Sequence, residues 1–278
     1  MAGRSGPRLV RMEHEGVAWH EDPAMRARGV VIAFSERTGG VSVAPYASLD
    51  LAAHVGDVAE RVDENRSRLL DALGIGAMSA HLTTAEQVHG ARVAEIEPRA
   101  AGAGASATRG SPPIAGADAL TTTEVGIPLM LLFADCVPLV LVVPGPRPAV
   151  AVVHAGWRGA LAGIAGNAVR VLAGSSDRPV QDIIAYVGAH IGSCCYEVGE
   201  DVLSRFTNRS ANMAAAVAGD RLDLGAAVSE DLAKAGVSMD RQCHLGVCTA
   251  QTTDRYFSYR AEGVTGRHGA LAVILGDA

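Results

Sequence analysis

Continuous apolar runs dominate the middle of the chain. IPLMLLFAD, VPLVLVV and PAVAVVH follow one another between residues 127 and 154, and the turn PGPRP separates the last two. Runs that are apolar at every position predict strands buried on both faces. GVVIAF at 29–34, DIIAYVG at 182–188 and ALAVILG at 270–276 have the same character and predict further strands.

Apolar residues at helical spacing separate several of these runs. Asp57 is a good N-cap, with Glu60 three residues later as its capping-box partner. The residues predicted on one helical face are Val58, Val62, Asn65, Leu69 and Leu73, while Arg61, Glu64, Arg66 and Arg68 point elsewhere. The segments after His154 and at 226–236 are also helical in pattern. Because strands and helices alternate, we expect an α/β layered fold.

Length and composition favour one large unit with a substantial core. The chain has 278 residues, of which 49% are hydrophobic and 19% charged, so it is not of the disordered class. AGAGASATRGSPPIAG, residues 101–116, has no apolar periodicity. We expect it to form a long surface loop within a domain rather than a linker between domains.

Charge and apolar length limit the possible partners. The formal net charge is −6, which argues against nonspecific binding of nucleic acid. The start of the chain lacks the apolar stretch of a secretory signal. The apolar region 125–155 is interrupted by Asp135, Pro138 and His154, so it does not predict a membrane helix. We therefore expect a cytoplasmic protein without a membrane partner, and the odd number of cysteines, 5, favours reduced thiols.

Three residues that can bind zinc lie at the ends of apolar runs or in loops. They are His89, Cys136 and His154, and their separations of 47 and 18 residues are far from those of a local metal knuckle. Two imidazoles and a thiolate would leave the fourth position of a tetrahedral zinc open, as in catalytic sites. Two other interpretations remain: buried core residues, or a nucleophilic pair of Cys136 with one of the histidines.

Ten segments in order carry a resemblance to a known family. They are FSERTGGVS, YASLDLAAHVGD, ENRSRLL, EQVHGARV, ADALTT, ADCVPLVL, VAVVHAGWRG, IGSCCYEVG, LDL and YFSYR…TGRHGALAVI. The chain resembles the laccase-domain family, whose members are named multicopper polyphenol oxidases and also purine nucleoside phosphorylases. The resemblance implies one catalytic domain over 29–278, preceded by an amino-terminal extension, 1–28. It implies an α/β layered sandwich similar to the cysteine hydrolase-like fold.

The resemblance also implies an activity and a metal site. It implies zinc bound by His89, Cys136 and His154, with the same residues catalytic. The implied substrates are adenosine, inosine and methylthioadenosine together with phosphate, and the implied activities are phosphorolysis and adenosine deamination. Three positions depart from the family pattern: Glu36 where Thr is common, Asp50 where Asn is frequent, and Ala189 where Pro is usual. Asp50 would bring a negative charge near the substrate.

Phosphorolysis requires an anion site, and deamination requires a proton carrier. HAGWRG predicts a strand–glycine–helix turn whose N–H groups face an anion. Arg158 in this turn and Arg37 in the SERTGG loop are candidate phosphate ligands, although a surface ion pair is an equal alternative for Arg158. Glu86 and Asp135 are candidate proton carriers beside a water that the metal activates.

The remaining cysteines and aromatics have simpler interpretations. Core or pocket-wall packing is expected of Cys194 and Cys195, and no second zinc is expected between Cys243 and Cys248. The aromatic candidates for a pocket wall, or for packing alone, are Tyr256, Phe257 and Tyr259.

Three rival functions stay open. The first is a copper polyphenol oxidase, because the same donors accept copper, although the chain lacks His-x-His pairs. The second is a metal-free cysteine hydrolase that acts on cell-wall precursors. The third is a nucleoside-binding protein without catalysis.

Overall fold

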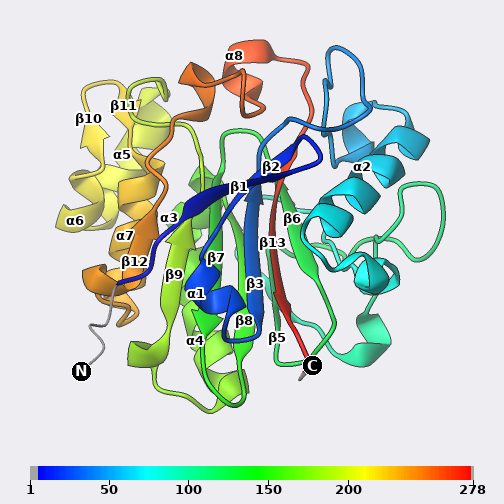
Figure 1. Ribbon diagram of the computed structural model, residues 1–278. Helices are drawn as coiled ribbons and strands as arrows, with labels where there is room; N and C mark the ends of the chain where they lie inside the picture. The colour runs from blue at the N-terminus through cyan, green and yellow to red at the C-terminus, as the bar shows by residue number, and fades with distance from the viewer. Residues whose placement is uncertain (1–5, 277–278) are drawn as a thin grey trace.

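Two β-sheets pack face to face, and helices cover the outer face of each (Figure 1). The computed structural model describes residues 6–276. The first sheet is antiparallel throughout, and its strands in spatial order are β1 (Val10–His14), β2 (Val17–Glu21), β3 (Val30–Ser35), β13 (His268–Ile274) and β6 (Leu129–Phe133).

The second sheet has six strands, antiparallel at its centre and parallel at its two edges. In spatial order they are β12 (Gln242–His244), β9 (Ile184–Val187), β7 (Val137–Val143), β8 (Ala149–Ala155), β5 (Ala119–Thr122) and β4 (Val93–Glu95). The predicted layered mixture of helices and strands is confirmed. The continuous apolar runs did not reveal that most strand pairs are antiparallel.

Alternating side chains of the central strands divide the core into layers. Val140 and Val152 face the first sheet, where they join Ile32 and Leu131 in one apolar cluster. Their neighbours in sequence face the helices on the other side. Every residue of β6, β7 and β8 is buried, so the prediction of strands buried on both faces is confirmed.

Helices complete the two outer layers. Those packed on the second sheet include α3 (Trp157–Ala162), α4 (Ile164–Ser176), α5 (Glu200–Arg209) and α7 (Leu224–Lys234). The first sheet is covered by α2 (Ala59–Ala72). The remaining short elements are α1 (Pro23–Arg26), α6 (Ala211–Ala214), α8 (Tyr259–Glu262), β10 (Val217–Ala218) and β11 (Arg221–Leu222). The segment 101–116 connects β4 to β5 as the expected loop.

The start of α2 differs from the sequence prediction. Val58 is the N-cap residue, and no side chain caps the helix. The Asp57 carboxylate instead accepts hydrogen bonds from the Val58 N–H and from the Ser42 hydroxyl. The predicted capping box is therefore wrong, because Asp57 joins the preceding loop to Ser42.

Arg66 was also placed incorrectly by the helical pattern. Its side chain is buried, and its guanidinium donates to the backbone oxygens of Leu51 and Gly104. Periodicity reports where apolar residues lie and does not detect an arginine that satisfies backbone carbonyls inside the protein. Arg66 thus ties the 101–116 loop to α2 and to the segment before it.

Residues 10–21, within the predicted amino-terminal extension, take part in the first sheet. Strands β1 and β2 pair with each other, and β2 pairs with β3. Glu36 is fully buried and accepts hydrogen bonds from Arg11 of β1 and from Arg255. Burial would raise the pKa of Glu36, but the two guanidinium groups lower it below its usual value. Glu36, at a position where Thr is common in the family, therefore has a structural role: it links β1 to the carboxyl-terminal segment.

Candidate active site

A cavity of about 430 Å³ opens where strands of both sheets end. Its wall includes residues of α8, which lies at the upper end of the molecule in Figure 1. β6 of the first sheet passes into β7 of the second through the three residues 134–136, and β8 passes into α3 through Gly156. The cavity wall contains three aromatic residues and three arginines. They are Trp157, Tyr196, Tyr259, Arg158, Arg260 and Arg267.

His89, Cys136 and His154 meet in this cavity. One donor atom from each residue lies within 4.8 Å of the donors of the other two, and the two imidazole rings meet edge to face with their centroids 4.8 Å apart. Cys136 directly precedes β7, and His154 lies on β8, opposite Pro138 of β7. The antiparallel pairing of β7 with β8 therefore brings together two residues that are 18 positions apart in the sequence.

Asp118 fixes two of these three residues, and the sequence analysis did not single it out. Its Oδ1 atom lies 2.9 Å from His154 Nδ1 and accepts the His89 backbone N–H at 2.9 Å. Its Oδ2 atom accepts the Gly90 N–H at 2.7 Å. With Nδ1 of His154 directed at Asp118, Nε2 is left for a metal.

The loop that carries His89 is held from a second side by Gln87. The Gln87 amide donates to the Leu132 carbonyl at 2.7 Å and accepts the Leu132 N–H at 2.9 Å. His89 has a φ of 61° and Gln87 one of 58°, a left-handed conformation that is uncommon for residues other than glycine. The two-point bond to β6 and the bonds to Asp118 hold the loop in this conformation.

Gly156 provides the space in which these side chains meet. A Cβ atom at this position would lie 2.8 Å from His89 Cδ2 and 3.1 Å from Cys136 Sγ. A contact of 2.8 Å is closer than side-chain carbons approach in proteins. The glycine of the HAGWRG segment is therefore required here by the close approach of His89 and Cys136.

Cys136 and His154 each stabilise the charged form of the other, the thiolate and the imidazolium. Burial would raise the pKa of the Cys136 thiol, but the neighbouring imidazoles lower it below its usual value. Burial would lower the pKa of His154, but Cys136 and Asp118 raise it. A thiolate beside two imidazoles is a donor set that suits zinc or copper, and three such donors leave one tetrahedral position open.

The two candidate proton carriers have different surroundings. Both oxygens of Asp135 are occupied, by the hydroxyls of Thr249 and Ser258 and by the Arg260 N–H, at 2.6 to 2.7 Å. Glu86 lines the cavity, and from the residues that the structure describes it accepts one hydrogen bond, from the Gly116 N–H at 2.8 Å. Asp135 therefore acts as a support for the cavity wall, and Glu86 has an oxygen available for a substrate.

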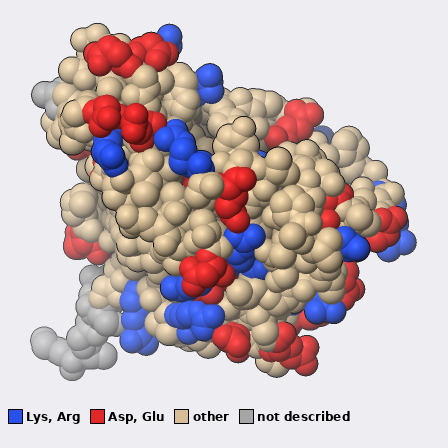
Figure 2. Space-filling view, turned by 90° about the horizontal axis from the view of Figure 1, so that it is seen from above, with Lys and Arg blue, Asp and Glu red and all other residues tan. Residues whose placement is uncertain are grey.

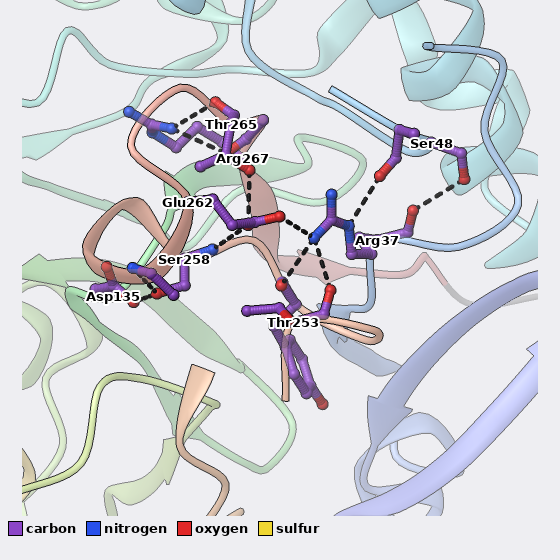
Figure 3. A network of polar contacts seen from close by, with 12 residues as sticks. Arg37, Ser48, Asp135, Thr253, Ser258, Glu262, Thr265 and Arg267 are labelled. Carbon is purple, nitrogen blue, oxygen red and sulfur yellow. Dashed lines mark hydrogen bonds and ion pairs between the residues drawn. The ribbon is translucent and has the colours of Figure 1, made fainter. Parts of the chain in front are cut away.

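The structure separates Arg158 from Arg37. Arg158 lines the cavity with its guanidinium over the Trp157 ring, 4.3 Å from the centroid, and forms no hydrogen bond or ion pair with any residue of 6–276. Arg37 is not among the residues of the cavity wall. Its guanidinium donates to the carbonyls of Ala47 and Thr253 and to Glu262 (Figure 3). Arg37 thus joins three chain segments, while Arg158 keeps its donors for a ligand.

Asp50 also lies outside the cavity. It is fully buried, and its Oδ1 atom accepts the N–H groups of Ala52 and Arg267. Its Oδ2 atom has no hydrogen-bond partner among the described residues. The connection of Asp50 to the cavity is therefore indirect: it accepts the backbone N–H of Arg267, whose side chain lines the cavity.

We expect Asp50→Asn to stabilise the protein at neutral pH. Burial raises the pKa of Asp50 from 3.8 to about 6. The folded protein therefore loses stability as the pH rises through this interval, because the buried carboxyl group becomes charged, and the loss persists at higher pH. Removing that charge should raise the free energy of unfolding by up to ~3 kcal/mol near pH 7.5 and change it little below about pH 4. Urea denaturation at both pH values measures this, and a less stable variant at pH 7.5 would contradict it.

The aromatic candidates divide between core and cavity. Tyr256 and Phe257 are fully buried, and only Tyr259 of the three lines the cavity. Trp157, Tyr196, Arg260 and Arg267 also line it, and sequence reasoning assigned them no role. The sequence signal that could have identified these four residues is the family resemblance, because each of them lies within a segment that carries it.

The face around the cavity carries mixed charge. Figure 2 shows acidic and basic side chains interspersed among uncharged residues over this end of the molecule. Within residues 6–276, none of the helices has both the length and the apolar character needed to cross a membrane.

Comparison with known proteins agrees with this architecture. A protein of Xylella fastidiosa strain 9a5c named purine nucleoside phosphorylase is 36% identical over 256 residues, which span 88% of this chain and 93% of that protein. Purine nucleoside phosphorylase YfiH of Escherichia coli K12 is 36% identical over 250 residues, 86% of this chain and 92% of its own. The crystal structure of YlmD from Geobacillus stearothermophilus superposes with a TM-score of 0.85 at 32% identity, over 95% of this chain and 98% of that chain.

The family assignment rests on nearly the whole chain. Residues 31–275 match the family described as multi-copper polyphenol oxidoreductase laccase. This range includes His89, Cys136, His154 and every residue of the cavity wall named above. The chain therefore belongs to the multi-copper polyphenol oxidoreductase laccase family.

Proposed function

We propose that this protein is a zinc-dependent purine nucleoside phosphorylase that also deaminates adenosine. The observation that carries the proposal is the convergence of His89, Cys136 and His154 in a cavity walled by aromatic and arginine side chains. The names of the relatives support the substrate class. Adenosine, inosine and methylthioadenosine are the proposed nucleosides, and phosphate is the second substrate.

The three converging side chains would hold zinc, and Asp118 would orient His154. When bound, zinc would supply a Lewis acid. Gly156 leaves the room that the His89 and Cys136 side chains need to approach one another. The remaining chemistry belongs to the protein's own residues around the cavity.

In phosphorolysis, a phosphate oxygen bonds to ribose C1′ as the bond from C1′ to the purine nitrogen breaks. Arg158 binds the phosphate in this proposal, because its donors are free and a guanidinium binds two phosphate oxygens at once. Arg260 and Arg267 already donate to the carbonyls of Glu197 and Thr265, so they contribute positive charge to the wall. The purine nitrogen takes the proton that the phosphate gives up, so that the products are the neutral base and ribose 1-phosphate.

In deamination, water adds at purine C6 and ammonia leaves. The free oxygen of Glu86 takes a proton from the water and returns it to the departing amine. Trp157, Tyr196 and Tyr259 supply flat surfaces against which a purine stacks. One cavity thus offers groups for both reactions.

The direct test is to measure metal content and turnover on the same preparation. We expect about one zinc for each chain at this site, release of adenine from adenosine only when phosphate is present, and formation of inosine without phosphate. Adenosine that binds but is not converted would favour the nucleoside-binding alternative and contradict the proposal.

Two enzyme alternatives have specific support and distinct outcomes. The family description favours copper and oxidation of phenols, which elemental analysis and assay of a phenol would reveal. The paired charges of Cys136 and His154 suit a metal-free cysteine hydrolase. Such an enzyme would keep its activity after exhaustive chelation, whereas the proposed phosphorylase would lose it.

We expect Arg158→Lys to weaken the use of phosphate selectively. An ammonium group cannot copy the two-point contact of a guanidinium, and the loss of charge-assisted bonding is about 1–3 kcal/mol. The phosphate dependence of phosphorolysis should therefore worsen by about ten- to a hundredfold, while zinc content and deamination stay nearly unchanged. Steady-state kinetics at varied phosphate concentration measure the effect.

Arg37→Lys is the matched comparison. It removes bonds between chain segments, so we expect lower thermal stability and no selective change in phosphate dependence. If Arg37→Lys has the selective effect and Arg158→Lys does not, phosphate binds near the amino-terminal loop instead. Equal loss of both activities in the Arg158 variant would remove its proposed phosphate role.

A further inference from the structure

A second group of side chains with the chemistry to hold a metal ion lies outside the cavity wall. The Sγ atoms of Cys194, Cys195 and Cys248 all lie within 4.8 Å of one another. Cys194 is exposed and the other two are half-buried. The prediction that Cys194 packs in a core or a pocket wall is therefore wrong, and the cluster needs another explanation.

The backbone around the cluster is arranged to let the three thiols approach. His190 forms a parallel bridge with Cys248, which places the turn at 192–195 beside Cys248 although the two segments are far apart in sequence. The Gly192 N–H donates to Cys248 Sγ at 3.2 Å. A Cβ at Gly192 would lie 3.2 Å from Cys194 Sγ, tighter than most Cβ contacts in proteins, and 3.6 Å from Cys248 Sγ, an ordinary contact distance.

We propose that Cys194, Cys195 and Cys248 form a binding site for a thiophilic d¹⁰ cation, Cu(I) or Zn(II). Binding replaces the thiol protons by the metal and releases those protons to solvent. Thiolates select these soft ions, and the group contains no carboxylate that would suit a hard cation. A disulfide would use only two of the three sulfurs, whereas a cation uses all three.

The location gives this site a link to the cavity. Cys248 precedes Thr249, whose hydroxyl donates to Asp135 Oδ1 at 2.6 Å. Ile191, one residue before Gly192, donates its N–H to the Asp135 carbonyl at 2.9 Å. Asp135 is in turn bonded covalently to Cys136. The thiol cluster and the His89–Cys136–His154 group are thus both connected to Asp135.

The test is metal uptake by the full-length protein under anaerobic, reducing conditions. Metal-free protein is titrated with Cu(I) against a chromophoric chelator, and separately with Zn(II). We expect the wild type to bind one more equivalent of at least one of these ions than Cys194→Ser or Cys248→Ser. Cys243→Ser is the matched control, because Cys243 is the remaining cysteine besides Cys136, and it should retain the full uptake.

Two further measurements separate this site from the proposed function. His89→Ala should keep the equivalent that Cys194→Ser loses, whether or not the protein proves to be a phosphorylase. Thermal melting verifies that each variant is folded, and Cys195→Ser provides an independent replacement within the cluster. Equal uptake by the wild type and all three cluster variants would overturn the proposal. Two fewer free thiols in the wild type than the five of the sequence would also overturn it, because a disulfide would then occupy the cluster.

Discussion

Cys136→Ala is expected to remove the proposed zinc from the cavity and to abolish the proposed phosphorolysis and deamination together. Cys136 is the one thiolate donor among the three converging residues, and a thiolate contributes strongly to a site with so few protein ligands. Loss of a Lewis acid removes several kcal/mol of transition-state stabilisation. Both rates should therefore fall by a factor on the order of 10³ or more, as measured by assays of adenine and inosine beside elemental analysis.

The control and the contrary outcomes for this change are distinct. Cys243→Ala removes a thiol that is not part of the cavity wall and should leave both activities unchanged. Full zinc occupancy at the cavity in Cys136→Ala would show that Cys136 is not a ligand. Loss of deamination alone would show that phosphorolysis takes place at another site.

Asp118→Asn should weaken metal binding by about 10–100-fold, the usual effect of changing a residue that orients a metal ligand. The carboxylate accepts three hydrogen bonds, from the His154 ring and from the N–H groups of His89 and Gly90. An asparagine amide has a single acceptor oxygen, so its NH₂ group would face a donor at one of these positions. Competition with a chelator of known affinity measures the change.

Glu86→Gln is the comparison for Asp118→Asn. Glu86 lines the same cavity but contacts the backbone of Gly116 rather than a metal-binding residue. We expect its replacement to slow deamination and to leave metal affinity unchanged. Unaltered metal affinity in Asp118→Asn would mean that the rigid strands alone position His154.

Local patterns revealed the strands but not their partners. The runs that became β6, β7 and β8 were recognisable because burial on both faces demands apolar residues at every position. Their pairing depends on long-range contacts that no short window of sequence contains. The same limit explains Asp57, whose bond to Ser42 replaced the expected helix cap.

The candidate site, like the fold, could be predicted from the sequence only in part. Positions at strand ends or in loops pointed to His89, Cys136 and His154 as possible zinc ligands, and the family resemblance implied that the three bind one metal. Asp118 could not be singled out, because an aspartate before a short strand has no distinctive spacing until the fold brings it to His154. Arg37 and Arg158 were equivalent as sequence candidates, and only the carbonyls around Arg37 distinguish them.

The short passage from β6 to β7 has a mechanical consequence. Only residues 134–136 join the two sheets at this point, and the φ of 93° at Asp135 leaves little freedom in the turn. Any sliding of one sheet over the other would strain the His89 loop, because this loop is bonded to β6 through Gln87 and to Asp118, which directly precedes β5 of the second sheet. The affinity of the site for a metal should therefore depend on how the two sheets pack against each other. Core substitutions far from the cavity should alter this metal affinity before the protein unfolds.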